Sequence, residues 1–521
     1  MSSHEMSPDI AVAYAVAGVL TVLAVAVDEA VVGWILALPI LACLYYTMIK
    51  QPLRSSLLWI MFFALTLENP SELPAAGHWQ SPLYVLGALL LNHMNGITGV
   101  PFLFFSGLDM FLGSLIVIAI HRRMTGSPID RAGRLPTPKP LIQLATISLA
   151  GTAFVWLTGW LRGGNNTFAV WQIYQVFYLP VVFLLYSTAL RGPKDCAALA
   201  RVMIGAALVR ACVAVYVNQT ISLPPDPEGN THLPYATSHA DSITFAIAFV
   251  LIVSLLIHRV KGARKIALLT LPILVAGMLN NNRRMVWVQI GLVLVTLYFA
   301  NPMNAMKYKL RKVVWVLTPF VALYIVAGWN HPTGVFKPVA TIRSVVDPST
   351  DLSAQTREIE NYDLMCTLKA NPLLGVGYGN RYLEVIGLLP MGHDLEPYIP
   401  HNSVLGLWAY AGLIGYSAMT LLWAAGVYFA TRAYKFTKKP QEQAAALMSY
   451  APVLVYLVQC WGDMGLGSTA GVFTVGPAIA MGGKLAVATG AWELTGRRAK
   501  RQAAEKVASK IPVTPAGVGR L

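Results

Sequence analysis

A histidine followed at a fixed distance by two glycines is the first pattern in this chain that could do chemistry. His401 and Asn402 precede nine residues, after which a four-residue group runs from Gly412 to Gly415. An imidazole titrates near neutral pH and can accept a proton from a hydroxyl or donate a hydrogen bond to a phosphate. A lone histidine at a helix start is more often structural. The two glycines favour function, because small residues let helices pack closely around a site.

Three arginines lie in or beside apolar segments. Arg210 lies seven residues before the end of its apolar segment. At about 1.5 Å per residue, this places it roughly 10 Å inside the membrane boundary. Arg283 and Arg284 follow three asparagines in a short turn. A cation near the bilayer core costs roughly 2.5–3.5 kcal/mol, and a guanidinium fork binds phosphate through two hydrogen bonds. We therefore expect an anion site, with Arg284 slightly ahead of Arg283.

A structural role for Arg210 stays open beside the functional one. It could pair with a carbonyl or a carboxylate, and Asp109, Asp241 and Asp463 all lie in or near apolar segments, as does Lys484. The sequence alone does not choose among these partners.

The composition indicates a membrane protein. The chain is 56% hydrophobic and 12% charged, whereas soluble domains carry about 25% charged residues. Apolar segments near the length of a bilayer span recur throughout. They lie near 10–27, 30–49, 55–67, 102–120, 141–161, 172–190, 198–217, 241–258, 266–281, 285–301, 313–330, 403–430, 443–460 and 467–487. We expect an all-α, polytopic inner-membrane protein with about 12–14 transmembrane helices, in which the short run 82–91 does not span.

The basic residues predict the orientation of these helices. Of the 39 lysines and arginines, 29 fall in one alternate set of loops and tails and eight in the other set. Because cytoplasmic loops carry the basic excess, both termini are expected in the cytoplasm and the segments 218–240 and 331–400 in the periplasm. This bias also explains the net charge of +15 without nucleic acid. The five scattered cysteines form no metal-spaced pair, and we expect neither metal nor cofactor.

The domain organisation is simple. One transmembrane domain, 1–490, includes the periplasmic loop 331–400, and a basic cytoplasmic tail, 491–521, follows. Within the loop, 358–369 is expected to form a short helix. Gly375, Gly377 and Gly379 indicate a sharp turn, since a phosphate-binding loop would end in Lys-Ser/Thr. Arg343 and Arg357 are weaker substrate-binding candidates in the same loop.

These motifs together resemble a known family. His401-Asn402 with Gly412-Leu413-Ile414-Gly415 resembles the signature of bacterial O-antigen ligases and the related O-antigen polymerases. The segment 372–380 is similar to the one that precedes this histidine in the family. Arg210, and Arg283 or Arg284, resemble its two essential arginines. The resemblance covers roughly 200–430; the remainder matches in hydropathy alone.

The resemblance implies a metal-independent membrane glycosyltransferase of the GT-C type, acting at the periplasmic face of a bacterial inner membrane. The donor would be a glycan on undecaprenyl diphosphate. The acceptor would be lipid A core in a ligase, or another lipid-linked glycan in a polymerase. The arginines would hold the diphosphate and His401 would activate the acceptor hydroxyl or assist at the phosphate, with Asn402 in support. Membrane lipids and other polysaccharide-assembly proteins are the further expected partners.

A transporter is the alternative from another class. A lipid-linked oligosaccharide flippase would also have about fourteen helices and basic residues. Its charges should line a cavity through the whole membrane depth, often in two repeated halves. In this chain the unusual arginines gather near one face, which favours surface chemistry over a transport path.

Overall fold

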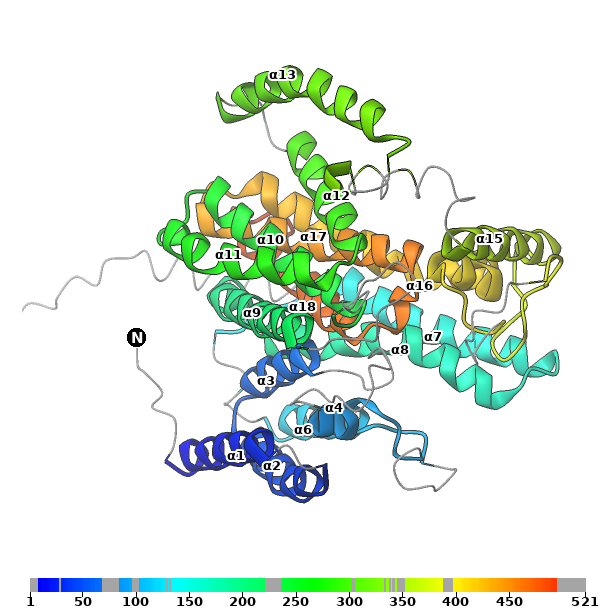
Figure 1. Cartoon of the computed structure of the whole chain (residues 1–521). Helices are drawn as coiled ribbons and strands as arrows, with labels where there is room; N and C mark the ends of the chain where they lie inside the picture. The colour runs from blue at the N-terminus through cyan, green and yellow to red at the C-terminus, as the bar shows by residue number, and fades with distance from the viewer. Residues whose placement is uncertain are drawn as a thin grey trace, which may run out of the picture.

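Every regular element that the structure describes is a helix (Figure 1). The computed structural model describes residues 8–27, 30–67, 84–95, 103–126, 130, 133–220, 236–300, 305–331, 334–336, 339, 343, 352–387 and 397–493. Each apolar segment expected from the sequence contains a helix. In chain order these are α1 (Pro8–Val27), α2 (Ala30–Lys50), α3 (Leu53–Thr66), α6 (Gly107–Met124), α7 (Lys139–Leu161), α8 (Asn166–Ala189), α9 (Cys196–Thr220), α10 (Ala240–Ile257), α11 (Ala263–Asn281), α12 (Met285–Ala300), α13 (Ala305–Gly328), α16 (Ser403–Phe436), α17 (Pro440–Gly462) and α18 (Thr469–Ala488).

The helices identify a multi-pass membrane protein. Within the described residues, nine are long and apolar enough to cross a membrane, and four further apolar helices are shorter. The run near residue 82 forms α4 (Tyr84–Leu91), a helix of eight residues. At about 1.5 Å per residue it is far too short to span a bilayer.

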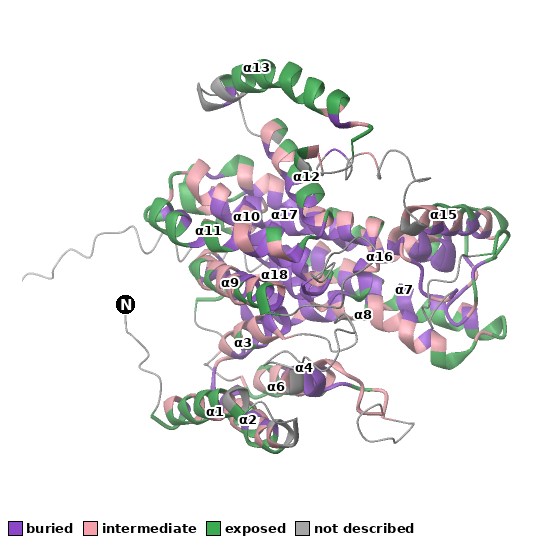
Figure 2. Cartoon of the chain, viewed as in Figure 1, coloured by how far each residue is buried: buried purple, intermediate pink, exposed green. Residues whose placement is uncertain are grey.

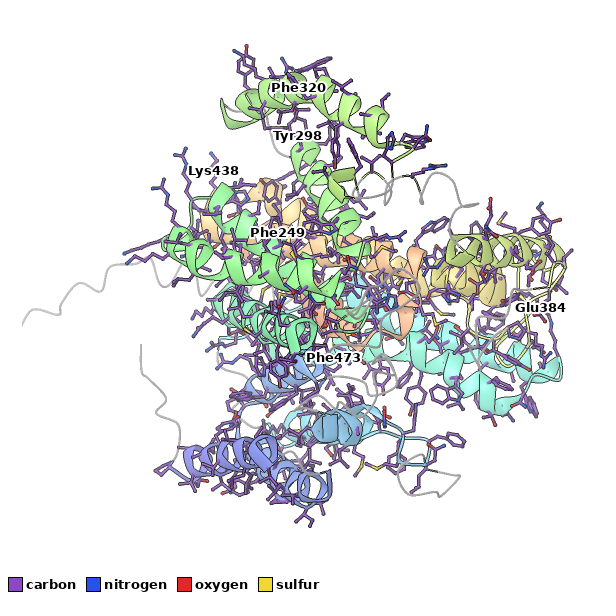
Figure 3. All side chains as sticks on the ribbon, in the orientation of Figure 1. Phe249, Tyr298, Phe320, Glu384, Lys438 and Phe473 are labelled. Atoms are coloured by element: carbon purple, nitrogen blue, oxygen red, sulfur yellow. The ribbon has the colours of Figure 1, made fainter. Side chains whose placement is uncertain are left out.

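The last helix, α18, forms the centre of the bundle. It packs against α8, α16 and α17, and its Phe473 is fully buried. Figure 2 shows α18 almost wholly in the colour of buried residues, whereas α13 is exposed along most of its length. Phe320 on α13 lies at the edge of the molecule and Phe473 at its middle (Figure 3). Exposed apolar surface on the outer helices is what contact with acyl chains requires.

The long polar segment carries structure of its own. The helix expected over 358–369 is present and longer, as α15 (Leu352–Ala370), and packs against α16. After it, residues 371–380 follow a path held by backbone hydrogen bonds rather than by a regular element. Part of the segment 331–400, which the sequence predicts to be a loop, is therefore a helix, α15, that packs against α16. Residues 221–235, within the other expected periplasmic segment, and 494–521, within the expected tail, lie outside the described residues.

A break in α16 explains the first glycine of the histidine pattern. Gly412 has φ 58° and ψ −173° inside an otherwise helical run. The carbonyl of Ala409 accepts from the Val376 amide at 3.1 Å, and the Leu413 amide donates to the Pro372 carbonyl at 2.9 Å. The chain at 372–377 thus replaces the helical hydrogen bonds lost at the break. An ideal Cβ on Gly412 would lie 2.4 Å from the Gly375 nitrogen, so glycine is required by both φ and space.

The glycine-rich segment 375–380 also docks on α7 and α8. A Cβ on Gly377 would lie 2.4 Å from the Gly159 backbone. The amide of Gly379 donates to Gln172 Oε1 at 2.6 Å, and its carbonyl accepts from the Asn165 amide at 2.9 Å. This close backbone approach is the sharp positioning turn that the sequence indicates.

The bundle has two distinct ends. Glu384, in the polar segment, and Lys438, between α16 and α17, lie at opposite ends of the molecule (Figure 3). We name the end with residues 352–387 and 397–402 the loop end, and the end at which α16 stops and α17 starts the basic end. Because the helices run along this direction, the two ends correspond to the two membrane faces.

Candidate functional site

A row of polar side chains begins at the loop end with His239, which precedes α10. Its Nδ1 is paired with the carboxylate of Asp463, directly after α17. Its Nε2 lies 2.7 Å from Nη1 of Arg283. His239 thus lies between the guanidinium of Arg283 and the carboxylate of Asp463, and links the turn after α11 to the end of α17.

The turn after α11 directs one arginine inward and its neighbour outward. Asn282 adopts the left-handed conformation, with φ 55°, and reverses the chain there. Arg283 is buried and its Nη2 also donates to the Thr237 carbonyl at 3.3 Å, whereas Arg284 is exposed. Asn281 holds the same segment, because its Oδ1 accepts from the Thr237 hydroxyl at 2.9 Å. Arg283 therefore contacts the buried polar groups at this turn, whereas Arg284, which the sequence places slightly ahead, lies at the surface.

Arg210 pairs with a carboxylate, one of the structural alternatives that the sequence leaves open. Its Nε and Nη2 donate to the two oxygens of Asp241 at 2.7 and 2.6 Å. Its Nη1 lies 3.4 Å from the Thr66 carbonyl. Arg210 is only 1% exposed. In this structure Asp241 occupies the guanidinium fork, and the pair fixes the first turn of α10, two residues after His239.

His401 is held by an acid from α15. The carboxylate of Glu360 accepts from the His401 backbone amide at 2.9 Å and lies 3.3 Å from its Nδ1. Glu360 is 1% exposed. Burial lowers the pKa of His401, but the hydrogen bond and charge of Glu360 outweigh it, so the net pKa is raised above its ordinary value. Arg357 opposes this rise through its charge and Asp463 adds to it.

Electrostatic interactions link the group that contains Arg283, His239 and Asp463 to the pair of His401 and Glu360. Burial raises the pKa of Asp463, but the hydrogen bond from His239 and the charges of His239 and Arg357 lower it to about 2. Asp463 and Arg357 both act on His401 as well. We name Arg283, His239, Asp463, Arg357, His401 and Glu360 the polar cluster. Through Asp463 and His239, the polar cluster links His401 to Arg283, although the two residues are far apart in sequence.

Nδ2 of Asn281 and Nε of Arg357 are buried donors in and beside the polar cluster, and neither atom has a hydrogen-bond partner among the described residues. Buried polar atoms in folded proteins are nearly always paired, so each such atom requires an explanation. Both are donors, which is the type of group that an anionic ligand would satisfy.

Other residues named from the sequence have structural roles. Asn402 is the N-cap of α16: its Oδ1 accepts from the Leu405 amide at 3.0 Å and its Nδ2 donates to Asn361 at 2.9 Å. Arg343 donates to the Trp329 carbonyl at 3.0 Å, near the end of α13. Asp109 accepts from Tyr174 at 2.9 Å, and Lys484 donates to the Leu135 carbonyl at 2.7 Å. None of these contacts reaches the polar cluster.

The sequence missed Glu360 and His239. One signal for His239 was available, since it begins an apolar segment after a polar stretch, as His401 does. Glu360 carried no signal, because it is one of several charges along α15. Within the described residues, no group of three or more His, Cys, Asp or Glu side chains could hold a metal ion. In comparisons with known proteins, no family model and no curated protein matches this chain.

Proposed function

We propose that this protein is a membrane glycosyltransferase of the O-antigen ligase type. It transfers a glycan from undecaprenyl diphosphate to an acceptor hydroxyl at the periplasmic face of a bacterial inner membrane. The observation that carries the proposal is the polar cluster at the loop end, in which Asp463 pairs with His239 beside buried Arg283 and also acts electrostatically on His401. A proton acceptor beside cations is what this transfer requires. The resemblance of the His401 motif to O-antigen ligases and polymerases adds to it.

The transfer would follow one concerted path. The acceptor oxygen forms a bond to the anomeric carbon of the donor sugar. The bond from that carbon to the phosphate oxygen breaks, and its electron pair leaves on the diphosphate. The acceptor's proton passes to Nε2 of His401, while Glu360 stabilises the imidazolium through Nδ1. A positioned general base of this kind contributes about 10²–10⁴-fold.

The departing diphosphate needs cationic donors, and the polar cluster offers them. Arg283 and Arg357 both carry guanidinium groups that can bind phosphate oxygens through two hydrogen bonds. The buried donors Asn281 Nδ2 and Arg357 Nε would gain a partner from such an anion. Arg210 has a positioning role in this scheme, because its pair with Asp241 fixes the start of α10 and thereby His239.

An apolar cavity beside Arg210 suits the lipid part of the donor. It has a volume of about 720 Å³ and lies among α1, α2, α3 and α4. Thr66 and Val209 line it, and they are respectively the hydrogen-bond partner and the chain neighbour of Arg210. A polyprenyl chain is fully apolar, so a wall of side chains such as Trp59 and Phe63 would favour it.

A deletion strain tests the proposal and separates its alternatives. Loss of a ligase should strand long glycans on the lipid carrier, and loss of a polymerase should leave single repeats there. Both outcomes support glycan transfer and define the acceptor. Loss of a flippase should instead leave lipid-linked glycan on the cytoplasmic leaflet, where an impermeant periplasmic probe cannot reach it. That last result would contradict the proposal.

A further inference from the structure

A second cavity opens at the basic end of the bundle. Its volume is about 650 Å³, within the range of roughly 300–1,000 Å³ typical of ligand sites. The start of α9, the end of α10 and the starts of α11 and α17 form its walls, together with α18. The polar cluster lies where α10 begins and where α11 and α17 end. The two sites are therefore at opposite ends of the same helices and face opposite membrane surfaces.

The lining of this cavity combines two chemistries. Its interior is apolar, with Met203, Leu251, Met448 and Met481 among its walls. Among the described residues, four basic side chains also line it, namely Arg201, Arg259, Lys261 and Lys439, together with one acid, Glu442. Of the residues that line the cavity, none is aromatic. An interior of aliphatic and thioether groups beneath a cationic rim matches an amphiphile with an anionic head.

The one acid in the lining is already engaged by its neighbours. Glu442 accepts from Lys439 Nζ at 3.0 Å and from the Thr437 hydroxyl at 2.6 Å. Lys439 and Glu442 neutralise each other, so this pair adds no net charge to the rim of the cavity. Arg201, Arg259 and Lys261 therefore give the rim its net positive charge, and all three are exposed.

Arg259 is placed at the rim in an unfavourable backbone conformation. It has φ 52°, in the left-handed region. Its amide donates to the Leu256 carbonyl at 3.1 Å and the Val260 amide donates to Leu255 at 3.0 Å. These two bonds define a helix C-terminal motif whose left-handed position is usually glycine. Here an arginine occupies it, and its guanidinium extends from the end of α10 at the mouth of the cavity.

We propose that this cavity binds an anionic diacyl phospholipid from the leaflet at the basic end. The phosphate contacts Arg201, Arg259 and Lys261, and an acyl segment enters between α9, α10 and α17. From Lys439 to Met448 the wall is roughly 13 Å deep at about 1.5 Å per residue. A soluble anion has no acyl chain to fill the apolar interior of the cavity, and a neutral lipid has no charge to pair with the cations at its rim. The proposal is independent of the chemistry at the loop end.

Native mass spectrometry of the purified full-length protein in a neutral detergent tests whether the cavity at the basic end binds an anionic phospholipid. Phosphatidylglycerol and phosphatidylcholine with identical chains are the probes. The variant Arg201→Gln/Arg259→Gln/Lys261→Gln removes the rim charge. The matched control, Arg264→Gln/Lys265→Gln/Lys438→Gln, removes the same charge from exposed residues on the same face that do not line the cavity. A second variant, Ala200→Trp, fills the cavity and keeps its cations.

The expected pattern is specific. Wild-type protein should retain phosphatidylglycerol over phosphatidylcholine by at least about tenfold. Since each cation contributes about fivefold to anionic-lipid binding, the rim variant should lose about a hundredfold and the control less than about fivefold. Ala200→Trp should also lose the lipid. Equal loss in rim variant and control, retention by Ala200→Trp, no preference between the lipids, or displacement by equimolar glycerol 3-phosphate would each overturn the proposal.

Discussion

At the scale of single residues, the contact between Glu360 and His401 gives the account its pH dependence. As a general base, His401 must be neutral, and its pKa is raised above the ordinary value because Glu360 outweighs burial. Transfer activity should therefore fall as pH drops through this raised pKa. Glu360→Gln removes the raising charge, so the acidic limb of the pH–rate profile should move to lower pH. The measurement is initial transfer rate against pH for both proteins.

The control for this experiment is structural. The thermal midpoints of wild type and Glu360→Gln should be compared first, because Glu360 also accepts from the His401 amide. An unchanged acidic limb in a folded Glu360→Gln protein would show that His401 does not set the pH dependence.

The two neighbouring arginines differ in burial and so should differ in effect. Arg283→Lys keeps the charge but loses the planar fork that contacts His239 and Thr237. Removal of one positioned donor typically lowers kcat by about 10²–10³-fold, and a loss of at least about 10²-fold is expected here. Arg284→Lys is the matched control, since that side chain is exposed, and should stay within a few-fold. The reverse order of the two effects would assign the anion site to Arg284.

At the scale of elements, the break in α16 is the feature most sensitive to a single methyl group. Gly412→Ala places an L side chain at φ 58° and ψ −173°, an essentially glycine-only conformation that costs about 1–3 kcal/mol, and its Cβ would meet backbone atoms at 2.4 Å. The thermal midpoint in detergent should fall by several degrees, and activity should fall with it, because α16 carries His401 at its start.

Gly291→Ala in α12 is the control for this change, because a Cβ there meets nothing within 4 Å. Alanine is the better helix former by about 1 kcal/mol, so this variant should be as stable as wild type or more so. A Gly412→Ala protein as stable as the control would mean that the docking of 372–377 on α16 does not support the loop end.

The elements themselves could be predicted from the sequence because their signal is local. Long apolar runs and basic loops locate each helix, although α13 starts eight residues before the expected segment 313–330 and α16 ends six residues after the expected segment 403–430. The sequence predicts a helix over 358–369, before Asn371-Pro372, and α15 starts six residues earlier. The contacts between side chains at the loop end could not be predicted, because they depend on how helices distant in sequence pack. Arg210 and Asp241 are 31 residues apart, and Glu360 and His401 are 41 apart. No periodicity encodes such pairs, so Arg210 could be named, but Asp241 could not be chosen from its three possible aspartate partners.

For the whole molecule, glycan transfer from a periplasmic donor requires the loop end to face the periplasm. In a cysteine-free background, Cys366 on α15 and a new Lys438→Cys at the basic end report the two faces. An impermeant maleimide should label Cys366 in spheroplasts and Lys438→Cys only after the membrane is permeabilised. The reason is the 29-to-8 division of basic residues between alternate loops. Labelling in the opposite order would show that the protein has the inverted orientation, with the polar cluster on the cytoplasmic side.

In the proposed reaction, His401 takes the proton while the polar cluster holds the lipid-linked donor. The most direct measurement is glycan transfer by purified protein, reconstituted without nucleotide, from an undecaprenyl-diphosphate-linked glycan to either lipid A core or a second lipid-linked glycan. Wild type should form product with one of these acceptors. His401→Ala should form none, while its binding of the donor is unchanged. Transfer by a folded His401→Ala protein at the wild-type rate would contradict the account.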